Sequence, residues 1–150
     1  MKKTLKLFAL LTVFVGLLAT GCSKEETDPR DQYVGTWQST QTGSLIMYYD
    51  GQPIVTMPIN ETSSIVISKS GQNNLNIGGQ IFTLNGNQLT ASPESMNITE
   101  DGMNLVGTAI YSGQASPNLI VINSTITGSW SGAGAAGNMS GSTTWTLTKQ

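Results

Sequence analysis

From residue 33 onward, apolar and polar positions alternate in short runs separated by turn residues. In the last run, Trp145 and Leu147 share one face of the chain, and the threonines around them share the other. This period of two is typical of a half-buried strand. No segment of convincing length has the periodicity of an amphipathic helix. The pattern predicts an all-β domain. Its strands are expected near residues 34–40, 44–49, 53–58, 63–68, 74–77, 80–84, 88–91, 96–99, 104–112, 118–127 and 143–149.

Turn signals separate several of these runs. Asp50-Gly51 and Asp101-Gly102 each lie between two apolar runs, and so does Asn85-Gly86-Asn87. Glycine after Asn or Asp supplies the positive φ that tight hairpin turns require. Because short runs joined by glycine are often one bent strand, we expect about 8–10 strands. Sequential hairpins form a meander, and closure removes its exposed edges, so the predicted fold is a single antiparallel up-and-down β-barrel.

Three segments bear on the barrel interior. The run at 105–112 puts small residues beside a large one on one face, as a tapering interior requires: Leu105, Gly107, Ala109 and Tyr111. The run at 119–122 is apolar on both faces, so its second face is either covered by another element or forms an outer hydrophobic patch. Residues 128–142 are small and glycine-rich around Trp130. They predict a flexible surface loop or, alternatively, a mobile lid at an open barrel end.

The first 21 residues have the three parts of an export signal. Three lysines precede an apolar stretch at residues 7–19, and small residues lie just before Cys22, the chain's one cysteine. Thirteen residues make a helix about 20 Å long, which is shorter than the roughly 30 Å hydrocarbon core of a bilayer. We therefore expect a signal peptide at residues 1–21 rather than a spanning anchor.

The segment Leu18-Ala-Thr-Gly-Cys22 resembles the lipobox of bacterial lipoproteins, with Ala19 where leucine is commonest. The resemblance implies that the Cys22 thiol receives diacylglycerol, that the chain is cut before it, and that the new amine is acylated. The mature protein would then be held at a membrane by its lipid chains. The alternative is an ordinary secretory peptide with an incidental cysteine. Residues 22–32 are polar and charged, which predicts a flexible lipidated tether before the domain at residues 33–150.

The residues after Cys22 bear on location and partners. Ser23 and the Lys24-Glu25-Glu26 run resemble the sorting signals of lipoproteins that reach the Gram-negative outer membrane and its outer surface. Removal of residues 1–21 takes away three of the seven cations and none of the nine carboxylates, which leaves a net charge of −5. Such a chain has no electrostatic reason to bind nucleic acid or anionic headgroups.

The segment Gly35-Thr-Trp37 resembles the start of the lipocalin or calycin barrel, and the mature chain resembles small calycin-like lipoproteins of Gram-negative bacteria. In that family the tryptophan closes one barrel end, and glycine lets the chain pass close beneath it. A basic residue near the end of the last strand covers the tryptophan. By this resemblance we expect Lys149 to lie over Trp37 in a cation–π contact of about 0.5–2 kcal/mol.

Groups for catalysis are scarce. The chain has no histidine, and it has neither a Gly-x-Ser-x-Gly nor a Ser-x-x-Lys segment. Glu61, Glu94 and Glu100 are candidates for a paired-acid glycosidase site, but nothing in the sequence brings two of them together, so solvated loop charges are the better interpretation. No spacing typical of metal ligands occurs either. We predict a non-enzymatic protein without metal or cofactor.

The sequence leaves two main functions open. In the first, the barrel binds a small apolar or amphipathic ligand or a glycan. Four methionines could give this barrel an adaptable lining, although they would equally suit a filled core: Met47, Met57, Met96 and Met103. In the second, a filled barrel docks a partner envelope protein through the strand at 119–122. An interior volume of about 300 Å³ or more favours the first. An enzyme inhibitor is a third possibility.

Overall fold

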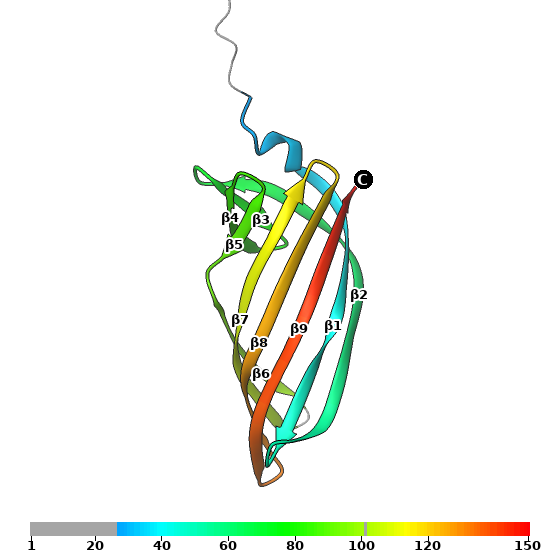
Figure 1. Cartoon of the computed structure of the whole chain (residues 1–150), viewed down its shortest axis with the longest axis vertical. Helices are drawn as coiled ribbons and strands as arrows, with labels where there is room; N and C mark the ends of the chain where they lie inside the picture. The colour runs from blue at the N-terminus through cyan, green and yellow to red at the C-terminus, as the bar shows by residue number, and fades with distance from the viewer. Residues whose placement is uncertain (1–26, 101) are drawn as a thin grey trace, which may run out of the picture.

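The computed structural model of the chain describes residues 27–100 and 102–150 (Figure 1). A short 3₁₀ helix, η1 (Asp31–Tyr33), precedes the strands, which then follow one another to the end of the chain. They are β1 (Gly35–Tyr49), β2 (Gln52–Ser70), β3 (Asn74–Ile77), β4 (Gln80–Asn85), β5 (Gln88–Ala91), β6 (Glu94–Glu100), β7 (Met103–Ser116), β8 (Leu119–Gly132) and β9 (Ala135–Lys149). The end of the barrel that carries η1 is called the upper end, as it is drawn in Figure 1.

The strands form one antiparallel sheet that closes on itself. Successive strands pair from β1 to β5 and from β6 to β9, β9 returns to β1, and β5 pairs with β7. Eight strands therefore make a closed ring, and β6 is an additional strand on the edge of β7 below β5. This arrangement confirms the predicted single antiparallel up-and-down barrel.

Several predicted strands are longer than expected, because short runs merge. The runs at 34–40 and 44–49 are both in β1, and those at 53–58 and 63–68 are both in β2. Gly43 explains the first merger, since a Cβ at that position would clash with the carbonyl oxygen of Ser142 on β9. Glycine here permits close approach of two strands and does not interrupt the strand.

The loop or lid predicted at residues 128–142 is wrong. These residues form the lower ends of β8 and β9, which are joined by a tight turn at Ala133-Gly134. A Cβ at Gly137 would clash with the carbonyl oxygen of Tyr48 and lie 2.7 Å from Nε1 of Trp130. The glycines of this segment therefore serve close packing between strands. Trp130 is buried in the barrel interior instead of standing on a lid.

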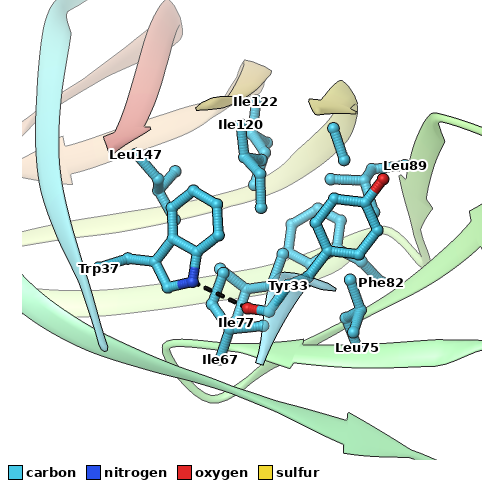
Figure 2. Close-up of a cluster of buried hydrophobic side chains, with 11 residues drawn as sticks. Tyr33, Trp37, Ile67, Leu75, Ile77, Phe82, Leu89, Ile120, Ile122 and Leu147 are labelled. Atoms are coloured by element: carbon cyan, nitrogen blue, oxygen red, sulfur yellow. Dashed lines mark hydrogen bonds between the residues drawn. The ribbon is translucent and has the colours of Figure 1, made fainter. Parts of the chain in front are cut away.

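The upper half of the barrel is filled by a large apolar cluster (Figure 2). The alternation predicted for the last strand is confirmed, because Leu147 is fully buried and Trp145 packs against the cluster. Ile120 and Ile122 are also fully buried, whereas Leu119 is 42% exposed on the outer face. The upper cluster consists of Tyr33, Trp37, Ile67, Leu75, Ile77, Phe82, Leu89, Ala115, Ile120, Ile122 and Leu147.

The lower half of the barrel is not closed by strand pairing. Residues 52–66 of β2 pair only with β1, and β6 pairs only with β7. We call this unpaired side, between residues 52–66 of β2 and strand β6, the open seam. Glu61 and Ser63 share the inward face of β2 with the fully buried Ile67, yet both are exposed. The inward face of the sheet is therefore open to solvent at the seam.

Candidate functional site

The upper end of the barrel is closed around Trp37. Its indole N–H donates a hydrogen bond of 2.8 Å to the carbonyl oxygen of Tyr33, and its ring is fully buried (Figure 2). The expected contact with Lys149 is present, with Nζ 5.8 Å from the ring centroid, and the same ammonium donates to the carbonyl oxygen of Gln32 at 2.6 Å. Gly35 starts β1 with a φ of 133°, which favours glycine, but a Cβ there would meet no atom within 4 Å, so the close passage expected from the resemblance is not the reason for this glycine. This end therefore has a sealed core with a charged cover.

An ionic cluster fastens the N-terminal segment to the same end. Arg30 pairs with Asp28 at 2.6 Å and donates to the carbonyl oxygen of Gly71 at 2.7 Å, while Lys69 pairs with Asp31. The hydrogen bond from Arg30 holds the pKa of Asp28 well below its usual range. Residues 28–32, which the composition assigns to the tether, are thus packed on the barrel. The signal peptide and Cys22 lie outside the described residues.

Between the two ends, the barrel interior carries hydrogen-bonding side chains, which we call the polar belt: Ser39, Gln41, Ser124 and Thr143. Three of the four are buried, and the hydroxyls of Ser124 and Thr143 are 2.7 Å apart. Gln41 Nε2 donates to Thr143 Oγ1 at 3.3 Å. A buried hydroxyl without a partner costs about 1–3 kcal/mol, so mutual hydrogen bonds are what makes such a belt tolerable.

Trp145 lies next to the polar belt, opposite Gln41 in the pairing of β9 with β1. Its indole Nε1 is buried and has no hydrogen-bond acceptor among the described residues. Its ring packs edge-on against Tyr111, with centroids 6.1 Å apart and an interplanar angle of 64°. Most buried indole N–H groups in proteins find an acceptor, so this one is a position at which a bound molecule would be stabilised.

Two carboxylates flank the seam at this level. Glu94 of β6 is exposed and accepts a hydrogen bond of 2.7 Å from the hydroxyl of Tyr111. Burial, together with this bond, raises the pKa of Tyr111 to about 12, so the phenol stays protonated and donates. Glu61 of β2, also exposed, pairs with Gln41 across the ladder. Glu61 and Glu94, predicted as solvated loop charges, are therefore on the inward faces of the two strands that border the seam. The side chain of the third predicted acid, Glu100, lies outside the described part.

A methionine-rich cluster fills the lower half beside the seam. Met47 and Met139 are buried in it, and Met57 and Met96 pack against it from the two seam strands. Three of the four methionines expected as a lining are therefore here, whereas Met103 is 37% exposed at the start of β7. The sequence analysis missed Met139, whose Cε occupies the space left by two glycines, so that a Cβ at Gly107 would lie 2.7 Å from it. The buried members are Leu45, Met47, Ala109, Ile126, Trp130 and Met139.

A separate hollow of about 550 Å³ lies on the outside of the barrel, where the β4–β5 turn meets β7 and β8. We call it the outer groove. Leu119 and Val121 are in its lining, so the second apolar face predicted at 119–122 is an outer patch. The other lining residues are amides, hydroxyls and small residues: Asn87, Gln88, Ser112, Gly113, Gln114, Ala115, Ser116 and Asn123.

Among residues 27–100 and 102–150, no three Cys, Asp or Glu side chains gather in a way that could hold a metal ion. Within these ranges, no helix has the length and apolar character needed to cross a bilayer. Comparison with protein-family models, with curated proteins and with solved structures finds no match for this chain.

Proposed function

We propose that this protein is a lipid-anchored, non-enzymatic binding protein of the Gram-negative outer membrane, and that it faces outward and takes up a small amphipathic molecule through the open seam. The observation that carries the proposal is the buried indole N–H of Trp145 beside the polar belt, which finds no acceptor within residues 27–100 and 102–150. Trp145 lies at the height of the barrel at which the open seam leaves the wall incomplete. A ligand with an acceptor oxygen would satisfy this donor and regain the free energy that burial costs it.

The surroundings of Trp145 suit a molecule with two different ends. Gln41 and Thr143 present hydrogen-bonding groups toward the same interior level. Below them, Met57 and Met96 belong to the two strands that border the seam, and they are only partly buried. Methionine side chains are flexible and polarisable, so they can adapt to an entering apolar group without a preformed cavity. The polar part of the ligand would bind at the belt, and the apolar part among the methionines.

The proposed anchor also suits this route. The described chain begins at Thr27 beside η1, at the upper end (Figure 1). Cys22 precedes Thr27 by five residues, which span at most about 18 Å when extended. A lipid on Cys22 would thus hold the sealed upper end near the membrane. The seam, in the lower half, would remain accessible from outside.

Lipidation is tested by mass spectrometry of the N-terminal peptide of the protein purified from its native membrane. We expect Cys22 at the N-terminus with diacylglycerol and an acyl chain, and a Cys22→Ala variant that leaves the membrane fraction. An unmodified Cys22 within an intact N-terminal segment would refute the anchor.

Ligand binding is tested by titrating the membrane-purified protein with a fluorescent single-chain amphiphile that carries an ester or amide head. Trp145→Phe removes the free donor and retains an aromatic ring, and we expect at least a tenfold loss of affinity. Trp37→Phe is the matched control, because the N–H of Trp37 already donates to the carbonyl oxygen of Tyr33 at 2.8 Å and its ring lies in the upper cluster, away from the methionines. The control should lose stability and keep its affinity for the amphiphile. Equal affinities of the wild type and Trp145→Phe would refute the proposed site.

A different observation supports the alternative function, in which a filled barrel is a module that docks a partner envelope protein. The upper and lower clusters fill much of the interior, and Leu119 is exposed beside Val121 in the outer groove. A module of this kind would dock a partner envelope protein at that patch. Cross-linking in intact cells from a photoreactive residue at position 119 tests it, and a specific cross-linked protein, lost on substitution of Val121 by serine, is the expected result.

A further inference from the structure

The outward face of four neighbouring strands has an unusual composition. β7, β8 and β9 run side by side across the front of the barrel in Figure 1, and β9 pairs with β1. None of the outward-facing residues of these four strands is charged. A soluble surface is designed with about 25–35% charged residues, so a face of four strands without any is unusual. The charged residues that the structure describes are instead at the two barrel ends and along the seam, as Lys69, Asp50 and Glu94 illustrate.

The outer groove lies on this uncharged face, and its lining is uncharged as well. Its amides come from the β4–β5 turn, β5, β7 and β8, and each carries two N–H donors and one acceptor oxygen. Its volume of about 550 Å³ is within the range of small-molecule sites, roughly 300–1,000 Å³. The four amide side chains are Asn87, Gln88, Gln114 and Asn123.

Two of these four residues are held in place by hydrogen bonds within the protein. The hydroxyl of Thr144 donates a hydrogen bond of 2.9 Å to Asn123 Oδ1. This bond uses the oxygen of the amide, so its Nδ2 hydrogens can still donate to a ligand. The backbone N–H of Ala115 donates to the carbonyl oxygen of Asn87 at 2.8 Å, which ties the β4–β5 turn against β7. Because strand residues and a tied turn supply the lining, less ordering is needed when a ligand binds.

We propose that the outer groove binds a neutral glycan. Sugar hydroxyls both donate and accept hydrogen bonds, and amide side chains offer both kinds of partner. Leu119 and Val121 provide an apolar surface for the C–H faces of a sugar ring. No cation lines the groove, so an acidic polysaccharide would lose hydration without compensation. The uncharged hydroxyl-rich face of β8 and β9 would let a longer neutral chain continue beyond the groove.

The test uses the membrane-purified protein and linear neutral hexasaccharides of glucose and of mannose, with an oligogalacturonate of equal length as the acidic comparison. Binding is followed by saturation-transfer NMR and by calorimetry. We expect saturable binding of at least one neutral hexasaccharide, an affinity that does not change with salt, and no binding of the acidic one. Binding of the acidic oligosaccharide with equal affinity, or of no neutral one, would overturn the proposal.

Variants locate the site. A Gln114→Ala/Asn123→Ala double variant should lose at least tenfold in affinity for the neutral hexasaccharide. Thr127→Ala is the matched control, since Thr127 lies on the same face of β8 but outside the groove lining. Unchanged affinity in the double variant would contradict the proposed site. Because the groove and the seam are on different sides of the wall, the double variant should still bind the amphiphile, and this result separates the two proposals.

Discussion

The hydroxyl pair in the polar belt gives a sharp prediction about stability. Thr143→Val keeps nearly the shape of the side chain but removes the oxygen that lies 2.7 Å from Ser124 Oγ and accepts from Gln41. Ser124 is 4% exposed, so water cannot easily replace the lost partner. The Ser124 hydroxyl is then buried without a hydrogen bond, which costs about 1–3 kcal/mol.

The same pair predicts that a second substitution restores stability. When both partners are replaced by apolar groups of similar shape, the change is close to neutral. A Ser124→Ala/Thr143→Val double variant should therefore be more stable than Thr143→Val alone, and it should fall short of the wild type only by the hydrogen bond that Gln41 Nε2 loses. The double-mutant cycle is measured by urea unfolding followed by tryptophan fluorescence, with unchanged m values as the check on two-state behaviour. If the single variant loses less than about 0.5 kcal/mol, or if the losses simply add, the hydroxyl pair is not a buried, mutually satisfied unit.

Two further predictions concern packing and pH. Gly137→Ala should destabilise the barrel by about 1–3 kcal/mol in urea unfolding, because the new Cβ clashes with the carbonyl oxygen of Tyr48. Asn138→Ala, at the exposed neighbouring position of β9, is the control and should change the free energy of unfolding by less than about 0.5 kcal/mol. The pKa of Asp28 is lowered in the folded state by Arg30, so its contribution to stability is present at neutral pH and is lost as the pH falls below the ordinary carboxyl range. Asp28→Asn should then reduce the difference between the unfolding midpoints at neutral and acidic pH, and an unchanged difference would contradict the ionic cluster.

The strand pattern of the upper barrel could be predicted from the sequence because alternation and turn residues act locally. Trp145 and Leu147 alternate with threonines, and a glycine turn such as Asn85-Gly86-Asn87 is recognisable without knowledge of the partner strand. The segment at 128–142 could not be predicted in this way. Its glycines are needed because another strand or a tryptophan lies close by, and that neighbour is distant in sequence.

The candidate site is harder to predict for a related reason. Ser124 and Thr143 interrupt the apolar inward positions of β8 and β9, but their meeting depends on strand register. The packing of Asp31 on the barrel likewise depends on Lys69, far along the chain. The sequence carried no signal for the seam, because the runs at 74–77, 80–84 and 88–91 are about as long as the next run, at 96–99. The difference in length arises only in the structure, where the runs before them merge into the long strands β1 and β2.

The most direct test of the proposed function uses the three tryptophan indole N–H groups as NMR probes. Those of Trp37 and Trp130 already donate to backbone carbonyl oxygens, whereas that of Trp145 has no acceptor in the part of the chain that the structure describes. On addition of lipids extracted from the native membrane, the account predicts a downfield shift of the Trp145 indole proton as it gains an acceptor, with the other two nearly unchanged. A Trp145 resonance that stays in place at saturating lipid, or moves no more than that of Trp37, would contradict binding at the seam.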